Sequence, residues 1–247
     1  MDLELERFRK RILSLKESAY LGKFIILPFY DETKNDIIRS AFSKNDSIFP
    51  VFYGGYEDAE YKRSIFSYVD ISPEMFEIDT LKINYSKLAG KFNHRDVLGS
   101  VLGLGLKREM VGDIIFNEDD CYIFVCSSKT DFIIENLHYI KNIPVNCDKS
   151  QIDFAIIKKY EEKLVFAKSL RLDLLISAFY NLSRKESLEL IQNGLVKVNH
   201  KECMNNSFTL KEKDLVSVRG KGRMILDEIK GKSKSDNYIL NIKKPID

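Results

Sequence analysis

The feature that most restricts how this chain can fold is a short passage, LSRKESLELIQNGLVKVNH, in which both ends of a helix are marked. Ser183 precedes Glu186 by three residues, which is the spacing of a capping box at the start of a helix. Apolar residues then recur at helical spacing, and Gly194 stands where a left-handed residue would end the helix. The alternating VKVN that follows indicates a half-buried strand. The passage therefore predicts a short helix that leads directly into a sheet.

The charge of the chain is unevenly distributed, although its net charge is only +2. Residues 1–80 carry 11 basic and 15 acidic side chains, residues 81–167 carry 12 of each, and residues 168–247 carry 16 and 10. The basic excess of the last third points to a polyanionic partner. Arg184 and Lys185, in the first turn of the predicted helix, would face solvent there. For any single one of these residues, an ordinary solvated charge is the alternative.

The length and composition allow two or three small domains, because 44% of the 247 residues are hydrophobic and 31% are charged. Apolar residues at three- and four-residue spacing predict an opening helix from Leu3 to Leu15, before a buried strand and a helix that Asp31 caps. Helical and strand patterns alternate from there without long linkers. We therefore expect an α+β fold in three parts: a small α/β unit at 1–78, an α/β domain at 79–160 and a two-helix-and-sheet domain at 168–247.

The four cysteines support neither a zinc site nor a disulfide framework. Cys121 and Cys126 lie in CYIFVC, which is typical of a strand, and their odd spacing should place the two thiols on opposite faces. The amino terminus lacks the apolar run of a secretory signal, and no stretch is apolar for long enough to span a membrane. These patterns predict a cytoplasmic protein with reduced thiols, no membrane association, no metal and no cofactor.

Residues 169–218 resemble the S4 RNA-binding domain. The resemblance rests on an R-L-D helix, an S-R helix start, a G-x-V-x-V-N strand with its hairpin, and a final D-x-V-x-V strand, all in register. His200 stands where the family usually has glycine in the hairpin turn. Asn199 can adopt the positive φ angle that such a turn requires, so we expect the turn to form with some strain.

The S4 resemblance implies a surface that recognises the shape and charge of structured RNA through its phosphates and 2′-hydroxyls. The RNA-binding candidates in this domain are Arg171, Ser183, Arg184, Lys185, Gln192, Lys197, Asn199, Lys201, Arg219 and Lys221. The basic residues of the two helices and of the first hairpin are expected to lie on one surface. Asp173 is expected to have a structural role, either by pairing with a nearby basic residue or by capping. Glycines in the loop RGKGRM would let its amides approach a phosphate, although a plain hairpin is the alternative.

A second passage, HRDVLGSVLGLGLKRE, resembles several catalytic or phosphate-binding motifs at first sight. A kinase catalytic loop would need asparagine where Val101 stands, and the glycines fit neither a P-loop nor a dinucleotide-binding loop. Pseudouridine synthases that carry S4 domains have an R-L-D-x-x-T-S-G-L motif, which neither this passage nor LRLDLLIS continues. An acid or base role for His94 or Asp96 stays open, but the sequence identifies no catalytic partner and hence no catalytic site.

The same passage closely resembles the T-H-R-D-x-L-G-x-L-L-G-L-G-I-K-R-E signature of the YlmH-type ribosome-associated S4 proteins of bacteria. This resemblance covers nearly the whole chain and is weakest over residues 1–80. It implies that residues 79–160 form an RRM-like RNA-binding domain. CYIFVC supplies one tyrosine and one phenylalanine, which is less than a complete aromatic stacking motif.

Without an active site, the passage fits a helix that Asn93 or His94 opens and Gly105 ends. Gly99 and Gly103 would allow this helix to pack closely against a neighbouring element. The RNA-binding candidates at its two ends are Arg95, Lys107 and Arg108. A structural helix with solvated charges is the alternative.

Together the resemblances imply a non-enzymatic RNA-binding protein of the large ribosomal subunit. The implied partners are rRNA and tRNA, including peptidyl-tRNA, and the implied role is the rescue of stalled nascent chains in ribosome-associated quality control. One alternative is an RNA-modifying enzyme of the pseudouridine-synthase kind, delivered to its substrate by the S4 domain. Another is a ribosome-bound adaptor, in which the acidic residues 1–80 dock a basic ribosomal protein or a rescue factor.

Overall fold

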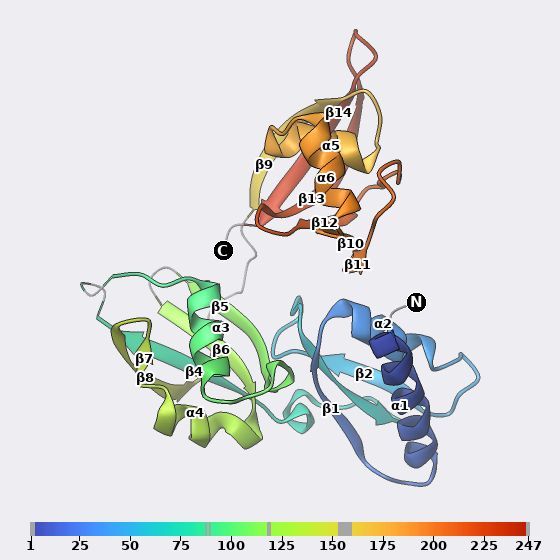
Figure 1. The fold of residues 1–247 in the computed structure, drawn as a ribbon. Helices are drawn as coiled ribbons and strands as arrows, with labels where there is room; N and C mark the ends of the chain where they lie inside the picture. Colours follow the sequence, from blue (N-terminus) through green and yellow to red (C-terminus); the bar gives the residue numbers. More distant parts are fainter. Residues whose placement is uncertain (1–2, 87, 89, 118–119, 153–159, 246–247) are drawn as a thin grey trace. The chain divides into compact units, whose positions relative to one another are not determined.

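The computed structural model describes residues 3–86, 88, 90–117, 120–152 and 160–245. The chain divides into two compact units, residues 1–156 and 157–247, each of which is described by itself (Figure 1). The first unit contains the part expected at 1–78 and all of the part expected at 79–160 except residues 157–160, which fall in the second unit. The second contains the part expected at 168–247 together with the strand that precedes it. The division into three parts remains a prediction.

The amino-terminal part of the first unit is a three-stranded antiparallel sheet with two helices. Its elements are α1 (Leu3–Tyr20), β1 (Ile25–Tyr30), α2 (Glu32–Ser40), β2 (Phe49–Tyr53) and β3 (Lys62–Ser67). The strand order is β1-β3-β2, and the apolar stripe of α1, with Phe8 and Ile12 buried, packs into the same core. Asp31 caps α2 by accepting a hydrogen bond from the Lys34 amide at 3.1 Å, so the predicted cap is confirmed.

The rest of the first unit is a five-stranded antiparallel sheet with two helices on one face. Its elements are η1 (Pro73–Phe76), β4 (Ile78–Tyr85), α3 (His94–Gly103), η3 (Arg108–Met110), β5 (Val111–Asn117), β6 (Asp120–Cys126), η4 (Ser127–Lys129), α4 (Thr130–Asn136), β7 (Tyr139–Ile140) and β8 (Ile143–Ser150). The strand order is β5-β6-β4-β8-β7. With β4 and β6 in the centre and α3 and α4 as the crossovers, this is the RRM-like arrangement that the resemblance implied.

Strand β6 is buried on both faces because it lies between two cores. Cys121 and Ile123 face the core that α3 and α4 cover, whereas Phe124 and Cys126 pack with Phe29 of β1 on the other side. The two thiols therefore face opposite sides of the sheet, as predicted, and both are buried and unpaired.

The second unit is a six-stranded antiparallel sheet with two helices on one face. Its elements are β9 (Tyr160–Ala167), α5 (Leu172–Tyr180), α6 (Arg184–Gln192), β10 (Val196–Val198), β11 (Lys201–Glu202), β12 (Leu215–Val218), β13 (Gly222–Lys232) and β14 (Tyr238–Pro245). The strand order is β11-β10-β12-β13-β14-β9. Strands β9 and β14, which the sequence analysis did not identify, pair along their whole length. In the described part of the chain, no helix is long and apolar enough to cross a membrane.

Candidate nucleic-acid interface

Helix α6 begins with a complete capping box. The Ser183 hydroxyl accepts a hydrogen bond from the Glu186 amide at 3.2 Å, and the Glu186 carboxylate accepts one from the Ser183 amide at 2.7 Å. These bonds satisfy two of the backbone donors that a helix start leaves open. They also hold the pKa of Glu186 below its ordinary value, with the Ser183 side chain as the largest cause. The predicted helix start is therefore confirmed.

A buried carboxylate gathers two arginines beside this helix start. The Asp173 side chain is fully buried, and it receives two bonds of 3.0 Å from the Arg171 guanidinium, one at each oxygen. The Nε atom of Arg184 lies 3.6 Å from the same carboxylate. Arg171 and Arg184 keep 36% and 64% of their side chains exposed, so both can still contact a ligand. The structural role predicted for Asp173 is confirmed, and this bidentate pairing raises the pKa of Arg171.

The loop of the β12–β13 hairpin lies beside the end of α5. Lys221 and Tyr180 line the same cavity, and Tyr180 lies three residues before Ser183. Lys221 also makes a minor contribution to the lowered pKa of Glu186. Gly220 and Gly222 have φ angles of 80° and 102°, as a tight hairpin of this kind requires. RGKGRM is thus a hairpin, and Arg219 and Lys221 lie in it.

The first hairpin of the sheet does not place its lysines on the helix face. Val196 and Val198 are buried against the helices, so the pleat turns Lys197 to the opposite face of the sheet. The expectation that Lys197 shares a surface with Arg184 is therefore wrong. A contact between Lys197 and RNA would therefore involve a separate surface. Lys201 lies exposed on the edge strand β11.

The turn between β10 and β11 forms as predicted, with positive φ angles of 48° at Asn199 and 66° at His200. The side-chain amide of Asn199 donates a hydrogen bond to the Asp214 carboxylate at 2.8 Å, and its oxygen accepts one from the Leu215 backbone amide at 2.9 Å. These bonds tie the turn to the loop before β12. Asn199 thus has a structural task, and an RNA contact by it stays a prediction.

Two further candidates lie on the exposed side of α6. Lys185 has 87% of its side chain exposed and pairs only loosely with Glu189, at 3.9 Å. Gln192 ends the helix and is exposed. Both are accessible to a ligand, and their contacts with RNA remain predictions.

Helix α3 of the first unit also begins with a capping box, formed by Asn93 and Asp96. The Asp96 carboxylate pairs with the Lys141 ammonium at 2.7 Å, which is the largest cause of its lowered pKa. Since this carboxylate is ionised and engaged in the cap and the ion pair, it has a structural task. The helix runs to Gly103, and Gly105 follows with a φ of 88°, so the predicted end is confirmed.

The glycines of α3 do not serve close packing. A side-chain carbon added at Gly99 or at Gly103 would meet no atom within 4 Å. The expectation of a glycine-packed contact is therefore wrong, because α3 packs through Val97 and Val101 and turns its glycines outward.

The three basic candidates around α3 have different surroundings. Arg95 and Lys107 are exposed. The guanidinium of Arg108 instead lies 3.7 Å from the centre of the Tyr61 ring and donates to the Val111 carbonyl. Arg108 therefore joins the two sheets of the first unit, and an RNA contact by it stays a prediction.

The sheet face that an RRM uses for RNA is covered here. Phe124 is 1% exposed and packs against Tyr56, with 5.4 Å between ring centres. Tyr122 is 6% exposed and carries the Lys82 ammonium above its ring. The buried Asp113 fixes the covering loop by accepting hydrogen bonds from the Tyr56 hydroxyl at 2.6 Å and from two backbone amides. RRM-like topology thus comes without an open aromatic platform.

The geometry and the comparisons with known proteins agree. Two helices on a small sheet, with arginines gathered at the helix starts, define an RNA-binding unit of the S4 class. The chain matches the family described as "S4 domain" over residues 170–216 and that described as "Putative RNA-binding domain in YlmH" over residues 72–153. It is 32% identical over 233 residues, 93% of this chain and 88% of the relative, to the ribosome-associated protein quality control protein P2 of Bacillus subtilis (strain 168). The chain therefore belongs to the YlmH family of S4-domain proteins.

A solved structure shares the fold. The chain called cell division protein ylmH from Streptococcus pneumoniae superposes with a TM-score of 0.52 at 23% identity, over 61% of this chain and 93% of that one.

Proposed function

We propose that this protein binds structured RNA of the large ribosomal subunit, or a tRNA on it, and acts without catalysis in ribosome-associated quality control. The name of the Bacillus subtilis relative supports the ribosomal setting, and the two matched RNA-binding families support RNA as the ligand. Such a protein works in the cytoplasm.

The observation that carries the proposal is the cluster of Arg171, Asp173 and Arg184. Burying a carboxylate is costly unless it is paired, and here both of its partners are arginines that remain partly exposed. An arginine held in this way presents its donors to a phosphate with less loss of conformational freedom than a mobile side chain. The adjacent Lys185 and Lys221 extend the basic surface, which suits closely spaced phosphates.

The test is sedimentation of the tagged protein through a sucrose gradient of cell lysate at low and high salt. The unchanged protein should sediment with the large subunit at low salt and stay near the top at high salt. Arg184→Ala with Lys185→Ala should release it at low salt without unfolding it, because Arg171 still neutralises Asp173.

A matched control removes two exposed lysines from the other end of the second unit, Lys230→Ala with Lys234→Ala. This control should sediment like the unchanged protein. If the protein stays at the top of the gradient in every condition, the proposal is wrong. Nucleoside mass spectrometry of rRNA and tRNA incubated with the protein tests the enzymatic alternative, and a new modified nucleoside would favour it.

A further inference from the structure

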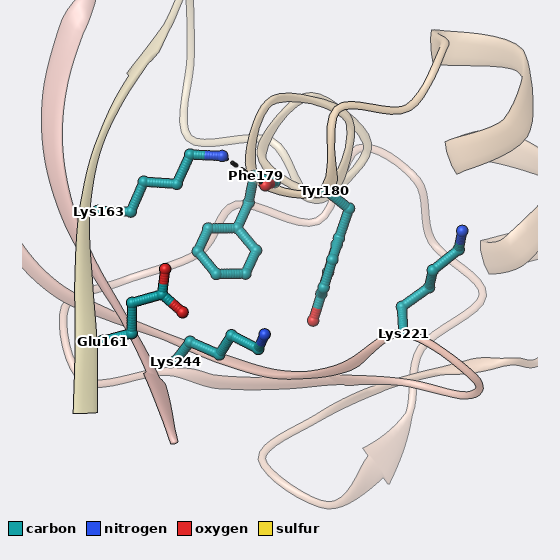
Figure 2. Close-up of a pocket in the computed structure, with 6 residues that line it drawn as sticks. All are labelled: Glu161, Lys163, Phe179, Tyr180, Lys221 and Lys244. Atoms are coloured by element: carbon teal, nitrogen blue, oxygen red, sulfur yellow. Dashed lines mark hydrogen bonds between the residues drawn. The ribbon is translucent and has the colours of Figure 1, made fainter. Parts of the chain in front are cut away.

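A cavity of about 240 Å³ opens at one end of the sheet in the second unit (Figure 2). It is lined by Glu161, Lys163, Phe179, Tyr180, Lys221 and Lys244. Only the two aromatic residues lie inside the matched S4 region at 170–216; the others come from β9, β14 and the β12–β13 loop. The cavity therefore exists only because β9 and β14 extend the S4 sheet.

The charges that line this cavity favour an anion. Three lysines and one carboxylate, that of Glu161, line the cavity, and Glu161 lies opposite Lys244 in the register of β9 and β14. The Lys163 ammonium donates a hydrogen bond to the Phe179 carbonyl at 2.9 Å. It therefore offsets the partial negative charge at the carboxyl end of α5, which lies at the cavity. Among the described residues, neither Lys221 nor Lys244 forms a salt bridge, so both ammonium groups remain available.

The Tyr180 hydroxyl belongs to the lining of this cavity. The Tyr180 ring points from the end of α5 into the space between Lys221 and Lys244 (Figure 2). Its hydroxyl is shielded from solvent and has no hydrogen-bond partner among the described residues. A buried hydroxyl without a partner costs free energy, and a ligand oxygen would remove that cost. Burial raises the pKa of Tyr180 to about 12, so the hydroxyl is a donor at neutral pH.

We propose that this cavity binds a phosphate group of the RNA, with Tyr180 donating a hydrogen bond and Lys221 and Lys244 supplying the charge. The proposal rests on the proposed RNA-binding function and extends its surface beyond the S4 helices. The volume is smaller than that of typical cofactor pockets, which run from roughly 300 to 1,000 Å³, and it suits a phosphate better than a whole nucleotide cofactor. Since Lys221 lies beside Tyr180, three residues before the capping residue Ser183 of α6, one RNA strand can contact both places.

The experiment measures binding of the full-length protein to bulk tRNA and to purified large-subunit rRNA over a range of salt concentrations. Lys244→Gln should weaken binding roughly threefold to tenfold and lower the logarithmic salt slope by about 0.7 to 0.9, the value for one phosphate contact. Glu161→Gln should tighten binding, because it removes the opposing charge. Lys230→Gln, at the far end of β13, is the matched control and should change neither quantity.

Tyr180→Phe separates a binding role from a structural one. It removes only the unpartnered hydroxyl, so the free protein should melt at the same or a higher temperature. Affinity for RNA should nevertheless fall by roughly threefold, with an unchanged salt slope because no charge is lost. A lowered melting temperature, or unchanged affinity, would count against the hydroxyl as a ligand group.

The outcomes distinguish this proposal from the proposed function. If Lys244→Gln binds like the unchanged protein while Arg184→Ala with Lys185→Ala does not, the cavity is not an RNA site and the proposed function stands. If the unchanged protein binds neither RNA, both fail. Titration with inorganic phosphate and with ADP, followed by NMR at the Tyr180 and Lys244 amides, tests the source of the phosphate. If ADP binds with a submillimolar Kd and Lys244→Gln binds RNA normally, the ligand of the cavity is a free nucleotide and not an RNA phosphate.

Discussion

Helices α6 and α3 begin in the same way but differ in what surrounds their first turns. Each opens with a complete capping box, from Ser183 in the second unit and from Asn93 in the first. At α6 a separate, fully buried carboxylate, Asp173, holds Arg184 in place. At α3 Arg95 is exposed, and the carboxylate beside it, that of Asp96, is already engaged in the capping box.

The comparison shows that a local signal sets where a helix starts but not whether its charges form a surface. A surface of gathered arginines needs an acceptor from elsewhere in the chain, and Asp173 comes from the preceding helix, α5. We expect the α6 surface to dominate RNA binding because its arginines are already ordered before the ligand arrives. Variants at the two helix starts should separate these roles.

Replacing the carboxylates of Asp173 and Asp96 should have unequal effects on the stability of the protein. Asp173→Asn removes a fully buried charge from two arginines and should lower the free energy of unfolding by about 3 kcal/mol, the low end for breaking a buried pair. Asp96→Asn weakens a cap and an ion pair whose lysine is exposed, so its cost should be clearly smaller than that of Asp173→Asn. Urea unfolding of both variants measures this, and equal losses would contradict the comparison.

Removing basic residues should separate the two surfaces in RNA binding. Arg184→Ala with Lys185→Ala should weaken binding roughly tenfold and lower the logarithmic salt slope by about 1.4 to 1.8, the value for two phosphate contacts. Arg95→Ala with Lys107→Ala removes the same charge near α3 and should change both quantities less. Filter binding over a salt series measures both variants. Equal effects would show that the two helices serve one interface.

The outward glycines of α3 allow a test of whether RNA approaches its backbone. Gly99→Ala with Gly103→Ala should stabilise the protein by about 1 kcal/mol, because both sites are open and alanine favours the helix. RNA affinity should not change if α3 is a structural helix. Stabilisation together with a clear loss of affinity would assign α3 a close contact with the ligand instead.

The two capping carboxylates should differ in how salt affects their contribution at low pH. Both have a lowered pKa in the folded protein, so the stability that each adds is complete above its ordinary pKa and is lost as the pH falls through the folded value. Glu186→Gln should therefore flatten the decline of the melting temperature as the pH falls below the ordinary pKa of a glutamate. For Asp96→Asn the same flattening should shrink in high salt, because Lys141 is its largest partner.

Several features of the fold could be read from the sequence because they depend on neighbouring residues. The capping box of α6, the start of α3 at Asn93 or His94, the positive φ at Asn199 and the opposite directions of Cys121 and Cys126 follow from spacing within one element. The basic excess of the last third likewise needs no structure. Family motifs extended these local signals to the S4 and RRM-like folds.

Other features depended on which distant segments meet. Lys197 lies opposite the helices because the pleat of β10 buries Val196 and Val198 against them. Strands β9 and β14 are far apart in the sequence, and their pairing brings Glu161, Lys163 and Lys244 to the cavity beside Tyr180.

Interactions within a few residues, which can be read from the chain alone, set where the helices begin, which residues take unusual backbone angles and where basic charge accumulates. The packed fold was needed to show that Arg184 joins Arg171 at the Asp173 carboxylate, that Phe124 is covered and that Gly99 faces outward. Burial and cross-strand pairing join residues far apart in the chain, and their geometry is fixed by the packed core rather than by local preference.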